Sequence, residues 1–264
     1  MPTLPIGDAE LYYREAGKGA PLLLIHGTGA HADVFEAAVP ALAERHRVIV
    51  YDRRGYSRSS SRAAPIKGYL KRQADDAADL LQGLGAVPAT VVGWSMGGVI
   101  ALCLALERPE LISRLVLCEP PLHATKHMPL GNLGTFLKAM LLSAIGRKRA
   151  AAATFFRMSL QLPDGRNAFD LIDEPTREGV LKNADTLLHE LKTGTGESLT
   201  PERVRELRCP ASVIVGGDTH ALFVDATERL SKLLPHAPVR RVPGAGHLMP
   251  LTHAAEFARL ALEA

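Results

Sequence analysis

Short runs of β-branched and aliphatic residues alternate with longer amphipathic stretches from Glu10 to about Leu117. The short runs are typical of buried strands, whereas apolar residues spaced three and four apart are typical of helices. This alternation predicts the α/β class, a parallel sheet covered by helices. The expected strands are Leu11–Arg14, Leu22–Ile25, Val48–Tyr51, Thr90–Val92 and Leu115–Cys118, and the expected helices are Val34–Ala43, Tyr69–Leu84 and Met96–Glu107.

The alternation is interrupted in the middle of the chain, where helical patterns follow one another without a strand. We therefore predict a core made of residues 1–120 and 206–264, with a helical insertion, a cap, at 121–205. The insertion is expected to hold helices at Leu130–Ile145, Ala150–Leu160 and Val180–Leu191, and the resumed core strands at Ser212–Val215 and Val239–Val242 with helices at Phe223–Leu234 and His253–Leu262.

Composition excludes several classes of protein. Of the 264 residues 47% are hydrophobic and 22% charged, which excludes disorder, and a net charge of +3 gives no excess for binding nucleic acid. No uncharged run reaches the ~18 residues that cross a bilayer, and the first residues do not resemble a signal peptide. Cys103, Cys118 and Cys209 are widely spaced in apolar runs, which favours a reducing compartment. We expect a cytoplasmic protein.

A candidate nucleophile lies between a strand and a helix. The strand Thr90–Val92 leads directly into GWSMGG at 93–98, which contains the pattern G-x-S-x-G. Glycines remove the β-carbons that would clash at such a sharp turn, so Ser95 is presented as a nucleophile. A helix N-cap serine is the alternative interpretation, but it leaves the paired glycines unexplained.

A serine hydroxyl needs a base and a site for the developing negative charge. His247 is the expected base, because it follows the last strand in PGAGH, after the nucleophile in chain order. Two backbone N–H groups are expected to form the oxyanion hole. One belongs to Met96, directly after Ser95, and the other to Thr28 in HGTG, whose His26 is expected to shape the loop.

These features resemble the α/β-hydrolase superfamily over nearly the whole chain. The resemblance rests on HGTG at 26–29, YDRRGYSRS at 51–59, GWSMGG at 93–98 and GAGH at 244–247. The second motif reads D-x-R-G-x-G-x-S in many relatives. In this chain Ser57 occupies the position of the second glycine. The resemblance implies a mostly parallel sheet and a helical cap that sets substrate choice. A serine nucleophile excludes the haloalkane dehalogenases and epoxide hydrolases of this fold, which use a carboxylate.

The acid that pairs with the histidine has two candidates. In most relatives it follows the seventh strand, three residues after a glycine, but Asp218 comes only two residues after Gly216. In a minority of relatives, to which zearalenone-type lactone hydrolases are similar, the acid is a glutamate at the end of the sixth strand. Glu119 stands at that position here. A carboxylate at the inner end of a buried strand is costly unless it is paired, whereas Asp218 could stay in water. This favours Glu119, with Asp218 as the alternate.

The expected function is hydrolysis of a small to medium, largely apolar ester or lactone through an acyl-enzyme. Carbon-carbon bond hydrolysis of ring-cleavage products and ligand binding by a receptor of hydrolase ancestry are the alternatives. His123 and His127 lack an acidic partner for a metal site, so we expect no metal. We also expect no cofactor, and neither nucleic acid nor membrane as a partner. Apolar cap residues expected mainly to form the cap core are Leu130, Leu133, Phe136, Leu137, Met140, Phe155, Phe156 and Met158.

Overall fold

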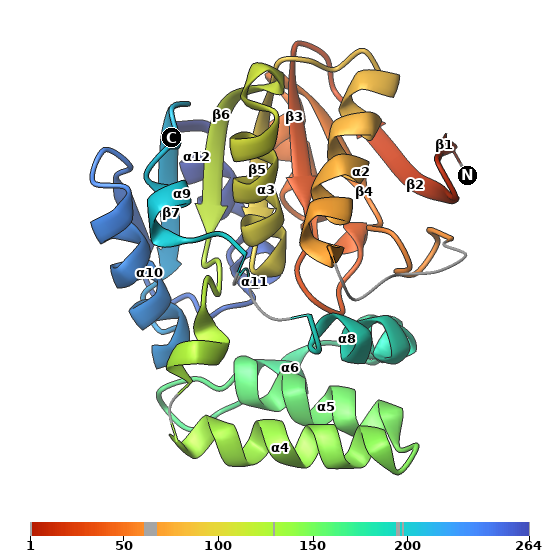
Figure 1. The fold of residues 1–264 in the computed structure, drawn as a ribbon, viewed down its shortest axis with the longest axis vertical. Helices are drawn as coiled ribbons and strands as arrows, with labels where there is room; N and C mark the ends of the chain where they lie inside the picture. Colours follow the sequence, from red (N-terminus) through yellow and green to blue (C-terminus); the bar gives the residue numbers. More distant parts are fainter. Residues whose placement is uncertain (1, 61–67, 129, 194–195, 197, 264) are drawn as a thin grey trace.

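The computed structural model describes residues 2–60, 68–128, 130–193, 196 and 198–263. Their strands form one eight-stranded sheet in the order β1-β2-β4-β3-β5-β6-β7-β8. The first two strands pair antiparallel at one edge, and the pairs from β4 to β8 are parallel (Figure 1). The predicted α/β class is confirmed. The strands are β1 (Thr3–Ile6), β2 (Ala9–Ala16), β3 (Ala20–Ile25), β4 (His46–Tyr51), β5 (Ala89–Trp94), β6 (Ile112–Cys118), β7 (Ala211–Gly216) and β8 (Val239–Val242).

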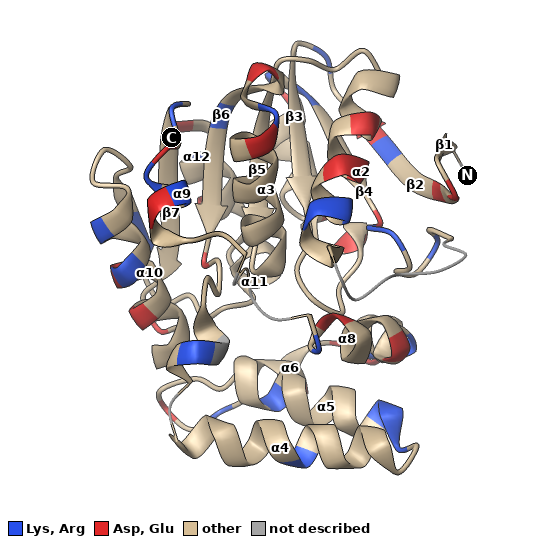
Figure 2. Ribbon diagram, viewed as in Figure 1, with Lys and Arg blue, Asp and Glu red and all other residues tan. Residues whose placement is uncertain are grey.

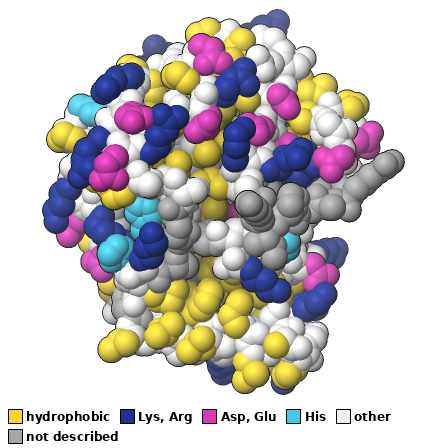
Figure 3. Space-filling view, viewed as in Figure 1, with side chains coloured by type: hydrophobic (Ala, Val, Ile, Leu, Met, Phe, Trp, Pro, Cys, Tyr) yellow, Lys and Arg dark blue, Asp and Glu magenta, His cyan; other side chains and the backbone are white. Residues whose placement is uncertain are grey.

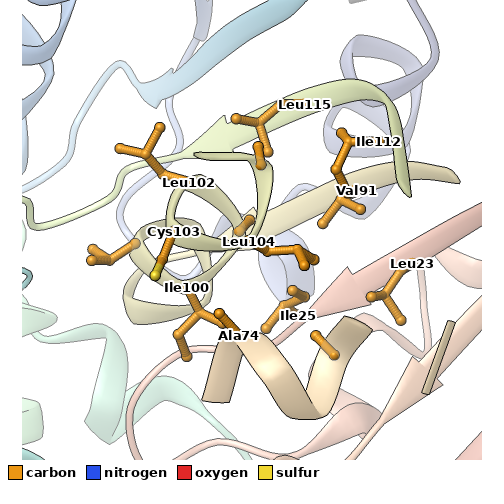
Figure 4. Close-up of a cluster of buried hydrophobic side chains, with 14 of the residues drawn as sticks. Leu23, Ile25, Ala74, Val91, Ile100, Leu102, Cys103, Leu104, Ile112 and Leu115 are labelled. Atoms are coloured by element: carbon orange, nitrogen blue, oxygen red, sulfur yellow. The ribbon is translucent and has the colours of Figure 1, made fainter. Parts of the chain in front are cut away.

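The central strands are apolar on both faces because helices cover both. In β3, Leu23 and Ile25 belong to one core cluster, and Leu22 and Leu24 belong to the other. The first cluster includes α2 and α3 (Figure 4), and the second includes α1 and α12. Such two-sided burial is typical of parallel sheets. These core helices are α1 (Val39–Ala43), α2 (Tyr69–Gly83), α3 (Met96–Glu107), α10 (Ala221–Leu233), α11 (Met249–Thr252) and α12 (Ala254–Glu263), with short 3-10 turns η1 (Ala32–Phe35) and η2 (Pro109–Leu111).

The inserted segment gathers beyond the carboxyl ends of the parallel strands (Figure 1). Its longest helices, α4 and α5, pack on each other, and the shorter α6, α7 and α8 contact α5. Within the described residues of 121–205 the only β pairing is an isolated bridge between Gln161 and Asn167. The cap limits stay a prediction. The elements are η3 (Ala124–His127), α4 (Leu130–Ala144), α5 (Lys148–Ser159), α6 (Ala168–Leu171), α7 (Glu174–Lys182), α8 (Ala184–Glu190) and α9 (Pro201–Val204), the last of which contacts α3.

Two helices that were predicted as continuous are each divided into two elements in the structure. The expected helix Val34–Ala43 is a 3-10 turn followed by α1, because Pro40 stands at the start of α1 and cannot lie inside a helix. The expected helix Val180–Leu191 is split between α7 and α8 at Asn183. The Asn183 side-chain amide donates to the carbonyl oxygens of Gly29 and Ala30, at 3.0 and 3.1 Å. A contact with the core therefore accompanies the break. Strand β1 was not predicted.

Candidate active site

Ser95 occupies a sharp turn between β5 and α3, with φ 56° and ψ −127°. A side chain at positive φ is strained, so the surrounding structure must hold it. A β-carbon at Gly97 would lie 2.0 Å from the carbonyl oxygen of Ile25, and one at Gly93 would lie 2.3 Å from that of Gly97. The two glycines of the motif thus permit the close approach of backbone on which the turn depends. The Ser95 N–H also donates to the Cys118 carbonyl oxygen at 2.8 Å.

His247 lies in the loop that follows β8 and is buried. Its Nδ1 atom lies 2.5 Å from Oε2 of Glu119. The imidazole stacks on the Phe223 ring, with centroids 3.5 Å apart and planes 8° apart. Trp94 Nε1 donates to the His247 carbonyl oxygen at 2.8 Å. Side chain and backbone of this histidine are therefore both held in place.

Glu119 follows β6 directly and is fully buried, with φ 46°. Its Oε1 accepts from the N–H of Gly216 at 2.7 Å, and its Oε2 accepts from the Thr219 hydroxyl at 3.1 Å as well as from His247. A buried carboxylate is costly unless hydrogen bonds replace its water. These three hydrogen bonds replace the water that burial removes from the Glu119 carboxylate.

Asp218, the alternate acid, is exposed. Its backbone N–H donates to the Ala245 carbonyl oxygen at 2.9 Å. A neutral imidazole with a proton on Nδ1 donates one hydrogen bond from that atom, and in the structure Glu119 accepts it. The structure brings Glu119 to His247 and leaves Asp218 outside this contact.

Thr28 and Met96 line the same pocket as Ser95 and His247. Met96 is the first residue of α3, where backbone N–H groups have no helical acceptor. His26 Nδ1 bonds the Gly27 carbonyl oxygen at 2.8 Å, and its Nε2 accepts from the Arg53 N–H at 2.9 Å. Burial and the nearby Arg53 guanidinium hold the pKa of His26 well below its usual range. The neutral ring therefore bridges the HGTG loop and the loop after β4.

The pocket itself is mostly apolar. Its lining comes from the loops at the carboxyl ends of the strands and from the cap. Among the described lining residues there is no lysine or arginine, and Asp33 and Glu190 are the carboxylates. The cap and core side chains that provide most of the apolar wall are Val34, Trp94, Phe136, Phe155, Phe156, Met158, Phe169, Val180, Phe223 and Leu248.

The expected cap residues divide into two groups. Phe136, Phe155, Phe156 and Met158 line the pocket, and Met140 is half-buried. The expectation of burial is wrong for three leucines on α4, because their side chains face away from the pocket and from α5. The exposed ones are Leu130, Leu133 and Leu137.

A buried ion pair joins cap and core beside the HGTG loop. Both guanidinium NH groups of Arg53 donate to Glu190 of α8, at 2.9 and 3.0 Å, and one also donates to the Gly27 carbonyl oxygen at 3.1 Å. The Tyr56 hydroxyl bonds the same carboxylate. Burial and then the Glu190 charge raise the pKa of Tyr56 well above its usual range. Tyr56 therefore stays a neutral donor.

Replacing Glu190 by glutamine should destabilise the fold by about 3–5 kcal/mol, because it leaves the Arg53 charge buried without its counterion. Urea unfolding followed by circular dichroism measures the change. Glu178→Gln is the matched control, since Glu178 bonds Arg149 at 2.7 Å on the exposed side of the cap. Such surface pairs contribute less than about 1 kcal/mol. Equal losses of unfolding free energy in the two variants would contradict the larger contribution expected of the buried pair.

Ser57, which departs from the usual glycine, keeps the left-handed backbone that a glycine would adopt, with φ 44°. Its N–H and hydroxyl both donate to Oδ1 of Asn183, at 2.9 and 3.1 Å. The amide that ends α7 therefore also supports this strained residue. His123, weighed above as a metal ligand, bonds the Leu199 carbonyl oxygen at 2.7 Å.

Comparison with known proteins decides the family. A family model described as the alpha/beta hydrolase fold matches residues 20–254, from β3 to the start of α12. The chain belongs to the alpha/beta hydrolase family. This match confirms the resemblance drawn from HGTG, GWSMGG and GAGH. In the described residues, no helix of this alpha/beta hydrolase is long and apolar enough to cross a membrane.

Individual relatives of this chain are named as hydrolases. An uncharacterized hydrolase of Bacillus subtilis, YraK, is 40% identical over 126 residues, which are 47% of this chain and 46% of that protein, so the match spans about half of the relative. A pimeloyl-[acyl-carrier protein] methyl ester esterase of Chromobacterium violaceum is 27% identical over 96% of this chain and 97% of the relative. The enol-lactonase of Burkholderia xenovorans shares the fold, with TM-score 0.82, 20% identity and coverage of 99% and 98%.

Three further residues of the site, Thr219, Phe223 and Glu190, are not predicted from the sequence. Thr219 bonds the Glu119 carboxylate, Phe223 stacks on His247 and Glu190 lines the pocket. Each reaches the site through a contact between segments far apart in sequence. Only Thr219 had a local signal, because it follows the Gly-Gly-Asp turn after β7.

Proposed function

We propose that this hydrolase cleaves a carboxylic ester or lactone, with Ser95 as nucleophile, His247 as base and Glu119 as the acid. The observation that carries the proposal is the 2.5 Å hydrogen bond between His247 Nδ1 and Glu119 Oε2, beside a pocket that Ser95 and His247 both line. A histidine whose Nδ1 proton is held by a carboxylate has Nε2 free to accept a proton.

The reaction then follows from these roles. His247 Nε2 takes the Ser95 hydroxyl proton as the oxygen attacks the carbonyl carbon, and the N–H groups of Thr28 and Met96 stabilise the negative oxygen. His247 returns the proton to the leaving alcohol, which departs and leaves an acyl-enzyme. Water, activated by the same histidine, hydrolyses the acyl-enzyme and restores Ser95.

The substrate class follows from the pocket wall. Its aromatic and aliphatic lining favours an apolar acyl group, and the lack of a lysine or arginine among its described residues disfavours an anionic one. The methyl ester esterase and the enol-lactonase named above are consistent with an ester or lactone. We also propose a cytoplasmic location, supported by three free cysteines, of which Cys103 and Cys118 are buried.

Turnover of p-nitrophenyl acetate and p-nitrophenyl butyrate tests the proposal. An esterase releases nitrophenol catalytically, whereas a binding protein of hydrolase ancestry releases almost none. A panel of lactones, linear esters and ring-cleavage products with a hydrolysable carbon-carbon bond then separates the alternatives. Cleavage confined to the carbon-carbon substrates would replace the ester assignment while retaining the serine.

Truncating Phe136 to alanine should change chain-length preference more than it changes kcat on an acetate ester. Phe136 lines the pocket from the cap helix α4, while the proposed catalytic residues all belong to the core. The ratio of kcat/KM for hexanoate to acetate esters measures the effect. Leu133→Ala is the control, because Leu133 is exposed on the same helix, and it should leave the ratio unchanged. Equal loss on every ester in folded Phe136→Ala would contradict a role in specificity.

A further inference from the structure

The outward face of α4 is apolar and uncovered. We call the four exposed leucines of α4, together with Ile145 directly after the helix, the outer stripe. At 3.6 residues per turn they lie within an arc of about 120°, and they make up five of the eight large exposed hydrophobic side chains in the described part of the chain. Figure 3 shows hydrophobic side chains gathered over the region where Figure 1 places α4. The outer stripe consists of Leu130, Leu133, Leu137, Leu141 and Ile145, which are 87%, 41%, 57%, 65% and 61% exposed.

The segment of the chain that contains the outer stripe is basic. Between Glu119 and Asp164 the sequence contains six lysines and arginines and no acidic residue. Figure 2 shows a basic position and no acidic one on α4. Among these residues, Lys148, Arg149 and Arg157 form ion pairs with Asp185, Glu178 and Asp170 of the cap. The exposed ones that no described ion pair includes are Lys126, Lys138 and Arg147.

We propose that the outer stripe binds an anionic lipid surface. An apolar face flanked by lysine and arginine is the pattern of helices that lie in the membrane interface, where leucines enter the acyl boundary and basic groups meet the headgroups. Helix α4 has 15 residues, fewer than the ~20 needed to span a bilayer, so it would lie along the surface. The earlier expectation of no membrane partner rested on the lack of a spanning segment, which does not bear on such binding.

A second copy of the chain is a less suitable occupant. A two-fold interface brings the same surface of each copy together, so the two outer stripes would meet. Lys138, at i+3 spacing from Leu141, would then lie at the interface without an acidic side chain of α4 from either copy to pair with it. An anionic lipid surface would instead bury the leucines at its acyl boundary and pair its headgroups with the basic residues.

The opposite face of α4 contributes Asn132 and Phe136 to the pocket wall. A lipid surface on the outer stripe would therefore lie about one helix diameter, about 10–12 Å, from the pocket. Apolar esters partition into lipid, so binding there would raise their concentration beside the cap. The binding inference itself does not depend on the proposed function.

Sedimentation of the full-length protein with vesicles tests the proposal. Vesicles of equal phosphatidylcholine and phosphatidylglycerol should bind it, and pure phosphatidylcholine should bind at least about tenfold more weakly, because each basic group near an anionic surface adds to the attraction. Raising the salt from about 0.1 M to about 1 M should release much of the bound protein, since the Debye length falls from about 10 to about 3 Å.

The double variant Leu137→Gln with Leu141→Gln should lower the vesicle-bound fraction by at least about tenfold, since two buried leucines are lost from the interface. Leu171→Gln is the matched control, because Leu171 of α6 is 63% exposed and lies outside the outer stripe, and it should bind like the wild type. Lys138→Glu provides a second variant if the double variant does not fold. Absence of binding by the wild type, equal binding by stripe variant and control, or a wild-type dimer that the stripe variant abolishes would each overturn the proposal.

Discussion

Replacing Ser95 by alanine should lower kcat on p-nitrophenyl acetate by about 10⁴-fold or more, with thermal unfolding unchanged. The substitution removes the attacking oxygen and leaves the oxyanion N–H groups, which account for the residual rate. Alanine keeps the β-carbon, so the backbone strain at φ 56° is the same in both proteins. Mass spectrometry after rapid quenching of the wild type should also find the acyl group on the peptide that contains Ser95.

Ser159→Ala is the matched control for this prediction. Ser159 also lines the pocket, but its hydroxyl donates within α5 to the carbonyl oxygens of Phe155 and Phe156, at 3.2 and 3.3 Å. The variant should retain nearly all of kcat. Full activity in Ser95→Ala, with contaminating esterase excluded by identical purification of both variants, would reject the serine mechanism.

The sequence predicted the sheet well because each core strand is defined by its own residues. Strand β8 lies at Val239–Val242 as expected, and β3 extends the expected Leu22–Ile25 by two residues. Both faces of β3 are buried, so a continuous apolar run marks it without knowledge of its neighbours. The cap could be predicted less well, since Asn183 ends a helix where its amide reaches Gly29 and Ala30. No local pattern encodes that contact.

The residues of the candidate site divide in the same way, into those with a local sequence signal and those without one. Ser95 and Thr28, which line the pocket, could be singled out because glycine-rich turns mark them. Phe223 and Glu190 could not, because an aromatic ring or a carboxylate on a helix has no local feature that says what it contacts. The leucines on α4 illustrate the converse error. Apolar spacing predicts that a helix face is covered, but it cannot identify what covers it.

Replacing Glu119 by glutamine should lower kcat by about 10⁴-fold while leaving substrate binding largely intact. The amide can still accept from the Gly216 N–H through its oxygen, but its NH₂ group then faces His247 Nδ1. Nδ1 must accept instead of donate, so the ring proton moves to Nε2, where it prevents uptake of the Ser95 proton. Separate measurement of kcat and KM with p-nitrophenyl esters, and circular dichroism to verify folding, test this outcome.

Asp218→Asn is the matched control and should cost about tenfold or less, because Asp218 is exposed and its backbone, not its side chain, is bonded to Ala245. The reverse pattern would assign the acid to the loop after β7. Large losses in both variants would mean that one carboxylate supports the other, and the double variant would then be no worse than either single one. If Glu119 alone supplies the charge, the double variant should instead show the two losses multiplied, because a turn residue in water and a buried acid act independently.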